Sequence, residues 1–487
     1  MSGHGLKVMV QKKIRWNSTG FLRLGMAVET IEHGGLKLRN INIAHVIEGS
    51  KFNSFHLSVL LWCIFLILFD GFDLVVYGAV IPSLVEEWGT APSVLGLIGS
   101  LTLVGGLIGS LLCGILADKV GRKKVIISCV VLFGTFTLLT GFAQGPVDFA
   151  LYRFTAGLGL GGIPPLLVVL TSEYSPKSIK NIMVGVMFSG YSIGGILVSL
   201  LGMKVIPDLG WQWMFFIGAI PLLSIPFLIK YLPESLYYYV EKGEYKKAKA
   251  IVKRLDPSYV PHEQDRFKND LQSVTGVPVV KVFENRLGRT TIMFWIACFM
   301  GLLMVYGLGT WLPQLMVEAG YPLNSSLLFL FSLNIGAIIG SICGGWLADR
   351  IGSKRVLISL FTFGAICLIL LGFKPGSIVL YLLVAVAGAA SIGSQNLNNA
   401  YISTFYPTYI KSTALGWALG IGRFGAILGP SIGGVLIELK LPIYMNFISF
   451  ALPALIAAAA ISFIQDKYNS SGSSFNGEFQ QRYEKID

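Results

Sequence analysis

Long apolar blocks constrain this chain more than any other sequence feature. From His56 to Ile464, apolar residues come in runs of about twenty with almost no charge, the length that a helix needs to cross a bilayer core. The runs are continuously apolar rather than alternating, which excludes a membrane barrel built from strands. Only 13% of the residues are charged, whereas soluble domains carry roughly a quarter. We therefore expect an all-α membrane protein.

The runs predict twelve membrane spans, at residues 57–85, 93–117, 124–143, 147–173, 181–203, 212–231, 290–312, 325–348, 356–373, 377–404, 412–437 and 441–464. An even number puts both chain ends on one side of the membrane. Lysine and arginine gather in alternate connecting segments, and the opposite segments hold only Lys204, Lys374 and Lys440. The positive-inside rule then places both termini in the cytoplasm, for a multi-pass protein of the cell (inner) membrane.

The predicted organisation has five parts. They are a cytoplasmic N-terminal tail 1–56, a six-helix bundle 57–231, a cytoplasmic middle loop 232–289, a second six-helix bundle 290–464 and a cytoplasmic C-terminal tail 465–487. The stretch from Met1 to Arg39 is expected to be loose. In the middle loop, residues 245–255 have helical apolar spacing, which leaves a helix along the headgroups and a plain linker both open. The net charge of +12 reflects this topology and does not indicate a nucleic-acid partner.

An internal repeat divides the chain into two similar halves. A shift of 231 residues aligns Gly114, Asp118 and Gly121 with Gly345, Asp349 and Gly352. Parallel repeats of this kind place the substrate site at their interface, near the bilayer midplane. The segment GILADKVGRKK at Gly114–Lys124, with its second copy, resembles the loop between spans two and three of the major facilitator superfamily. The resemblance implies a fold of two pseudo-symmetric six-helix bundles.

These loops predict a conformational gate. Glycine allows close helix approach, while the aspartate and basic residues can latch the cytoplasmic ends of neighbouring helices. The candidate gating residues are Gly114, Asp118, Gly121, Arg122, Asp349, Gly352, Arg355 and Lys411.

A few charges inside the spans break the repeat, and such charges are costly and usually functional. Span one carries Asp70 and Asp73, where the second half has Gly301 and Met304. A helical rise of about 1.5 Å per residue places Asp73 ~24 Å from the cytoplasmic side. Arg153 of span four then lies ~9 Å below the outer surface, at a similar depth to Asp73.

Asp70, Asp73 and Tyr77 share one helical face by their spacing. Burial favours a protonated carboxyl group and a neighbouring arginine favours the ionised form, so a moving arginine could couple a proton to an organic anion. No histidine lies within a span, which leaves carboxylates to carry the proton. We expect Asp73 to titrate and Asp70 to shape the pocket; the alternative is that Asp73 and Arg153 form a pair that merely fixes helix register.

Arg423 of span eleven lies ~16 Å in from the cytoplasmic side, without an obvious acidic partner. Its planar guanidinium suits a carboxylate ligand. In span ten, Gln395 and Asn398 share a face and could bind either a ring hydroxyl or the carboxylate. The candidate substrate-binding residues are Arg423, Gln395, Asn398, Tyr77, Phe72, Tyr306 and Trp417.

Five segments in order resemble the aromatic acid:proton symporters within the superfamily. They are Asp70–Asp73, Arg153 with Gly157–Gly162, Ser172–Tyr174, Phe405–Pro407 and Gly416–Arg423. The resemblance implies import of benzoate or 4-hydroxybenzoate with a proton by alternating access. It also implies functional roles for both span-one aspartates, Arg153, Glu173 and Arg423, with Glu173 placed among the proton-coupling residues. Lys411 and Ser353 depart from the usual pattern, at the gate.

Other functions remain open at this point. A niacin-type or other organic-acid carrier shares the fold and an anion-binding arginine, and a transporter-derived sensor is a further alternative. An enzyme is not expected, because the chain shows no nucleophile–base pair and no phosphate loop. The six cysteines all fall in predicted spans without metal-ligand spacing, so neither a metal nor a cofactor is expected. We expect a monomer whose partners are a small aromatic carboxylate, protons and the lipid bilayer.

Overall fold

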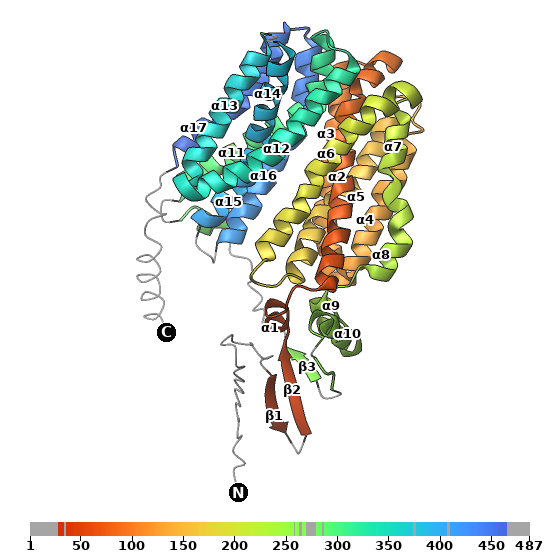
Figure 1. Ribbon diagram of the computed structural model, residues 1–487, viewed down its shortest axis with the longest axis vertical. Coiled ribbons are helices and arrows are strands. Elements are labelled where there is room, and N and C mark those ends of the chain that lie inside the picture. Colours follow the sequence, from red (N-terminus) through yellow and green to blue (C-terminus); the bar gives the residue numbers. More distant parts are fainter. Residues whose placement is uncertain are drawn as a thin grey trace.

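The computed structural model describes residues 28–33, 36–257, 259–262, 265–268, 279–284, 287–373, 376–406 and 410–464. In this part of the chain, 12 helical segments are long and apolar enough to cross a membrane. They form two groups of helices that lie side by side (Figure 1). The expected all-α membrane fold with two six-helix halves is confirmed.

The N-terminal half contains the first six spans. They are α2 (Ser54–Trp88), α3 (Pro92–Val120), α4 (Arg122–Thr140), α5 (Pro146–Glu173), α6 (Lys180–Leu209) and a sixth span formed by α7 (Gln212–Gly218), the 3₁₀ helix η1 (Ile220–Ser224) and α8 (Ile225–Tyr231). The sixth span is interrupted where Pro221 and Pro226 follow each other closely. Proline has no amide hydrogen and so weakens the regular α-helical bonding there.

The C-terminal half repeats this order. Its spans are α11 (Gly288–Glu318), α12 (Leu323–Ile351), α13 (Ser353–Leu371), a fourth formed by α14 (Ser377–Gly388), the π-helix η3 (Ala389–Gly393) and α15 (Ser394–Phe405), then α16 (Lys411–Glu438) and α17 (Ile443–Ser462). The predicted spans agree with these helices to within a few residues at most ends.

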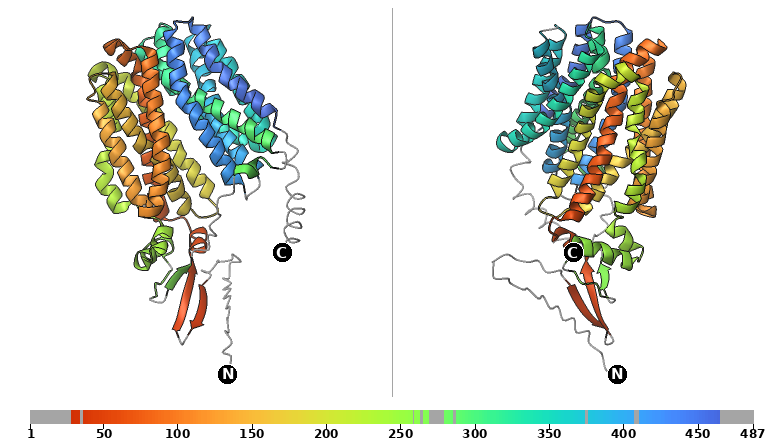
Figure 2. Two further views of the ribbon diagram at one scale, coloured as in Figure 1. Left: turned by 180° about the vertical axis from the view of Figure 1, so that it is seen from behind. Right: turned by 45° about the vertical axis from the view of Figure 1, so that its right-hand side comes forward.

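Below the N-terminal half lies a small extramembrane unit (Figures 1 and 2). It contains β1 (Val28–His33), β2 (Leu36–Asn42), α1 (Ile43–Glu48), α9 (Leu236–Glu241), α10 (Tyr245–Leu255) and β3 (Asp265–Lys268). Strand β2 pairs antiparallel with β1 and parallel with β3, which comes from the middle loop. The described part of the N-terminal tail is therefore folded rather than loose, and α10 matches the stretch with helical spacing. We call this end of the molecule the tail end, and the opposite end the far end.

Asn53 ties this unit to the first membrane helix. Its Oδ1 accepts hydrogen bonds from the amides of Phe55 and His56, which caps the N-terminus of α2. Its Nδ2 donates to the carbonyl oxygens of Arg254 and Leu255, at 3.0 and 3.1 Å, at the C-terminal end of α10. One side chain thus fixes the orientation of two helices, so α10 is held firmly to the N-terminal half.

The two halves contact each other closely in their far-end portions. A Cβ added at Gly78 of α2 would lie 2.2 Å from the carbonyl oxygen of Gly309 in α11, so only glycine permits this crossing. Between α3 and α16, the Ser100 hydroxyl donates to the Ile427 carbonyl oxygen and lies 2.7 Å from the Ser431 hydroxyl. Close backbone approach through small residues is the usual way in which membrane helices pack.

Toward the tail end the halves separate. Helices α3, α6, α12 and α16 each carry a glycine there at which an added Cβ would meet no atom within 4 Å; they are Gly114, Gly185, Gly345, Gly416 and Gly420. The contrast with the tight far-end crossings means that the space between the halves opens toward the tail end.

Candidate transport site

Asp73 and Arg153 form a buried ion pair inside the N-terminal half. Arg153 Nη1 donates to Asp73 Oδ2 at 2.7 Å, and both side chains are almost fully buried. The Thr137 hydroxyl of α4 donates to the other carboxylate oxygen at 2.8 Å. The depth estimate from sequence therefore paired Asp73 with the correct arginine. Together with Thr137, the ion pair connects α2, α4 and α5.

Tyr77 belongs to this cluster rather than to an open pocket. Its hydroxyl donates to the carbonyl oxygen of Leu95 in α3. The Arg153 guanidinium lies 5.8 Å from the centre of the Tyr77 ring and 5.7 Å from that of Phe215. Buried cations gain from such ring faces. A substrate contact for Tyr77 is not supported, because its hydroxyl already has a partner.

Asp70 lies in a different environment from Asp73, one helical turn away. It is buried, and it makes no hydrogen bond or ion pair with any residue that the structure describes. It is within electrostatic range of Asp73 and of Arg423. Tyr191 of α6 and Tyr306 of α11 interact with each other and also with Asp70. Asp70 therefore lies where the two halves meet.

Arg423 is the basic group on the opposite side of this site. It lies on α16, is partly buried, and interacts electrostatically with Asp70 and Tyr306. Within the described chain it has neither an ion pair nor a hydrogen bond to another side chain. An arginine in this state can accept a carboxylate ligand without first breaking a protein contact. The structure thus brings together Asp70, Tyr306 and Arg423 from three different helices.

Span ten supplies neutral polar groups at about the same level. Asn398 and Gln395 are buried on α15, and the Asn398 amide donates to Cys298 Sγ of α11 at 3.2 Å. Gly422, directly before Arg423, packs against the backbone of Cys298: an added Cβ would lie 3.2 Å from its carbonyl oxygen. The polar groups of span ten and Gly422, the residue before Arg423, therefore contact the same residue of α11.

The other predicted ring contacts differ in outcome. Phe72 is buried and packs against Gly218 and Phe69, so it forms part of the N-terminal core rather than the site. Trp417 is 46% exposed and stacks on Trp295 with ring centres 6.0 Å apart. It lies on the tail-end side of Arg423 in α16, where the space between the halves opens. The packing of Phe72 gives no support to a substrate contact for this residue, which stays a prediction.

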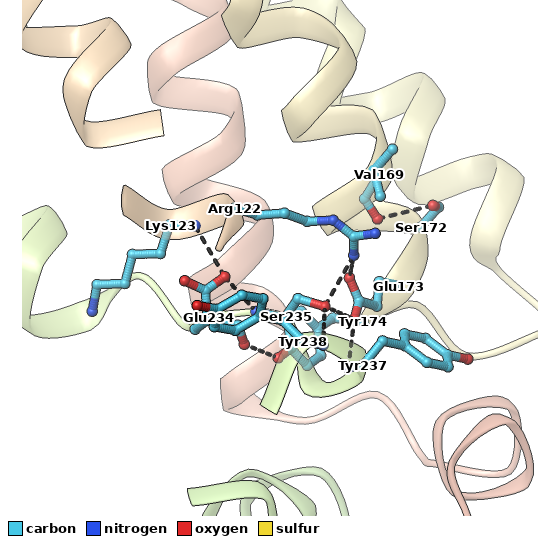
Figure 3. Close-up of polar contacts among 10 residues, drawn as sticks. All are labelled: Arg122, Lys123, Val169, Ser172, Glu173, Tyr174, Glu234, Ser235, Tyr237 and Tyr238. Atoms are coloured by element: carbon cyan, nitrogen blue, oxygen red, sulfur yellow. Dashed lines mark hydrogen bonds and ion pairs between the residues drawn. The ribbon is translucent and has the colours of Figure 1, made fainter. Parts of the chain in front are cut away.

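Glu173 is not part of the Asp73 cluster. It is the last residue of α5, and twenty residues of helix place it ~30 Å from Arg153 along the axis. It instead forms an ion pair with Arg122, while the Ser235 hydroxyl donates to its Oε1 at 2.5 Å (Figure 3). Glu173 therefore lies apart from Asp70 and Asp73 and pairs with Arg122, one of the predicted gating residues, while its role in proton coupling stays a prediction.

The start of the middle loop completes this gate network, as Figure 3 shows. Arg122 Nη1 also donates to the Ser235 hydroxyl at 3.0 Å, and the Lys123 amide donates to Glu234 Oε1 at 3.1 Å. The Tyr174 hydroxyl donates to the Glu234 carbonyl oxygen at 2.5 Å. Burial raises the pKa of the Tyr174 phenol well above its usual value, which keeps it a donor.

All but one of the remaining predicted gate residues are exposed. Gly121 is buried, and its φ of +102° and the Glu234 carboxylate beside it leave no room for a side chain. The others lie on the open surface at the tail end and have no ion pair among the described residues; they are Gly114, Asp118, Asp349, Gly352, Arg355 and Lys411. In this conformation the first copy of the loop is therefore engaged and the second is not.

Several residues of these sites were not identified from sequence. Thr137, Glu234, Ser235 and Cys298 are neutral or occur outside the internal repeat, so neither charge nor periodicity singles them out. A usable signal existed for Ser235, because the polar LeuProGluSer stretch follows a membrane span directly. Among the described residues, no group of three or more histidine, cysteine or acidic side chains could hold a metal ion.

Comparison with known proteins identifies the family. A family model described as Major Facilitator Superfamily matches residues 63–337 and 325–482. The solved structure of the xylose transporter XylE from E. coli, in a partially occluded inward-open conformation, is 19% identical with a TM-score of 0.66 and covers 85% of this chain and 100% of that chain. This likeness shows the shared fold.

Two relatives place the chain more narrowly. The benzoate transport protein of Acinetobacter baylyi is 45% identical over 88% of this chain and 94% of the relative. The gentisate transporter of Corynebacterium glutamicum is 37% identical over 89% of this chain and 90% of the relative. Both are transporters, not enzymes, which agrees with the expectation from sequence. The chain is a multi-pass membrane transporter of the major facilitator superfamily and belongs, within it, to the family represented by these aromatic-acid transporters.

Proposed function

We propose that this protein imports benzoate, 4-hydroxybenzoate or a related aromatic carboxylate together with a proton. The names of the relatives support the class of substrate. The distribution of basic residues supports a tail end in the cytoplasm, so the protein acts in the cell membrane with both termini inside. The working unit is a monomer in which the bundles 57–231 and 290–464 move against each other.

One observation carries the proposal: Arg423 and Asp70 come from different halves and lie within electrostatic range of each other, and neither has an ion pair in the described chain. Arg423 binds the substrate carboxylate when Asp70 is protonated. When Asp70 loses its proton, its charge competes with the substrate for Arg423, and the substrate is released. The proton and the anion therefore bind together because each removes one charge from the same pair.

This assignment moves the titrating role from Asp73, our expectation from sequence, to Asp70. Asp73 is committed to Arg153 and Thr137, and protonation would remove the charge that balances the buried guanidinium of Arg153. Asp70 has no such contact to lose. The Asp73–Arg153 pair then holds α2 against α4 and α5, which is the alternative role considered for these two residues.

The asymmetry between the two ends supports alternating access. The halves are closed at the far end and open at the tail end, and with the tail end in the cytoplasm we place the site facing inward in this conformation. Rocking of the two halves would open the far end and bring the exposed gate residues Asp118, Asp349 and Arg355 toward the opposite half.

The test is uptake of labelled benzoate and 4-hydroxybenzoate into proteoliposomes, with and without an inward proton gradient. We expect gradient-dependent accumulation of at least one acid, and nicotinate as a competitor tests the niacin-type alternative. Accumulation of neither acid would overturn the proposed function, and strong preference for nicotinate would replace it.

A matched pair of variants tests the proton site. Asp70→Asn should still exchange internal for external substrate but should not accumulate it in response to a gradient. Asp73→Asn should lower the yield of folded protein, while the folded molecules remain coupled. The reverse result, with coupling lost in Asp73→Asn and retained in Asp70→Asn, would return the titrating role to Asp73.

A further inference from the structure

Three buried side chains at the start of α15 have polar atoms without partners. Ser394 Oγ, Gln395 Oε1 and Asn398 Oδ1 are shielded from solvent and make no hydrogen bond in the structure. Buried polar atoms nearly always have a partner, and each exception needs an explanation. Three exceptions within one helical turn indicate that a ligand supplies what is missing.

The chemistry of the free atoms restricts the ligand. The Asn398 amide nitrogen donates to Cys298 Sγ at 3.2 Å, and the Gln395 amide nitrogen donates to Asn399 Oδ1 at 3.4 Å. Both carbonyl oxygens are therefore left as acceptors. A carboxylate has only acceptor atoms and would be repelled here, whereas a hydroxyl group can donate a hydrogen bond.

The backbone of α11 approaches this turn closely. An added Cβ at Gly301 would lie 2.6 Å from Gln395 Oε1, so this oxygen occupies the place beside α11 that a side chain would take. Directly before Ser394 the chain forms the π-helix η3, a departure from α-helical winding that is frequent at functional sites. Arg423 lies nearby, because Gly422 packs on Cys298, the residue that binds the Asn398 amide.

We infer that the preferred substrates are aromatic acids with a ring hydroxyl, which donates to Gln395 Oε1 and Asn398 Oδ1 while the carboxylate binds Arg423. The inference rests on the proposed function and ranks the proposed substrates: unsubstituted benzoate binds more weakly than a hydroxybenzoate. Of the two ligand groups considered for span ten, it selects the hydroxyl over the carboxylate.

Equilibrium binding to the purified full-length protein tests the inference without requiring transport. We expect at least one of 2-, 3- and 4-hydroxybenzoate to bind roughly 10- to 100-fold more tightly than benzoate, because benzoate leaves buried acceptors unpaired. Asn398→Leu and Gln395→Met should abolish this preference by weakening only the hydroxylated acid. Asn396→Leu is the matched control: it makes the same change on the same helix at an exposed position, and the preference should persist.

Equal binding of benzoate and all three hydroxybenzoates by the wild type would overturn the inference, as would an unchanged preference in Asn398→Leu and Gln395→Met. Absence of binding by any of these acids would instead overturn the proposed function.

Discussion

The two halves share a backbone plan but handle buried charge differently. Gly121 and Gly352, at equivalent turns, have φ of +102° and +93° and ψ of 146° and 138°. Around this common turn the first half places Arg122, Glu173 and Glu234, whereas Arg355 of the second half is exposed. The residues that repeat therefore determine the backbone turn between the helices. The residues that differ determine which side chains form ion pairs around that turn in each half.

The same contrast holds inside the membrane. The first half buries Asp70, Asp73 and Arg153, and the second has Gly301 and Met304 where the first has its aspartates. Around Gly301 the second half offers uncharged amides instead. The first half thus contributes most of the charged groups, and the second half contributes the neutral acceptors. Arg423 is the exception, because it is a charged residue of the second half. Four predictions test this comparison.

The largest effect is expected from the buried ion pair. Arg153→Met leaves Asp73 charged and unpaired in the N-terminal half and should lower the free energy of unfolding by about 3–5 kcal/mol. Replacing both partners, as in Asp73→Leu/Arg153→Met, should recover most of this loss. Unfolding in mixed micelles measures both variants. If the double variant is no more stable than the single one, the attraction between Asp73 and Arg153 itself stabilises the packing of α2 on α5. The loss in Arg153→Met would then not come from an unpaired buried charge.

The next largest effect is expected at the turn that Gly121 and Gly352 occupy in the two halves. Gly352→Ala should cost about 1–3 kcal/mol, because a side chain is strained at positive φ. Gly121→Ala should cost distinctly more, since its Cβ would also lie 2.3 Å from Glu234 Oε2. Thermal unfolding of the two variants side by side gives the difference. Equal losses of stability would show that the Glu234 side chain moves aside at no cost, and that its contacts around Gly121 do not hold it in place.

A smaller effect is expected from the arginines of the two loops. Arg122→Ala should lower the free energy of unfolding by about 1 kcal/mol, because it removes the hydrogen bonds to Glu173 and Ser235 at a partly exposed site. Arg355→Ala should stay within about 0.5 kcal/mol of the wild type. Both variants are measured at the same detergent concentration. Comparable losses of stability would contradict the conclusion that only the first copy of the loop forms stabilising contacts.

The smallest change in stability is expected at the exposed aspartates. Asp118→Asn and Asp349→Asn should each alter the free energy of unfolding by less than about 0.5 kcal/mol. Both should nevertheless slow uptake into proteoliposomes while equilibrium binding of substrate stays unchanged, because we propose that these residues form contacts only when the tail end closes. Wild-type uptake rates in both variants would remove them from the gate.

Much of the membrane fold could be predicted because lipid imposes simple rules. The length of each apolar run fixes a span, and helical rise converts residue number into depth, which is why the sequence alone pairs Asp73 with Arg153. Strand β3 was missed because it pairs with β2 across more than two hundred residues, and no local pattern reports such a contact. Strands β1 and β2 pair locally, in a stretch that was expected to be loose.

The orientation of side chains about each helix was harder to predict. Asp70 and Asp73 share a face by their spacing, yet Asp73 points to α4 and α5 whereas Asp70 reaches α6 and residues of the second half. A difference of one helical turn separates a structural ion pair from the proposed proton site. For Glu173, likewise, the sequence motif indicates the residue but not that it pairs with Arg122 at the end of α5.

The docked middle loop sets a limit on how far the halves can move apart. Strand β3 ends at Lys268, bound to β2 of the tail-end unit, and α10 is capped by Asn53 at the foot of α2. On the other side, the Val282 carbonyl oxygen, in the 3₁₀ helix η2 (Val279–Val282), accepts a hydrogen bond from Thr291 of α11 at 2.7 Å. Even at full extension the chain from 268 to 279 spans no more than about 36–40 Å, which limits how far the tail-end unit and α11 can move apart.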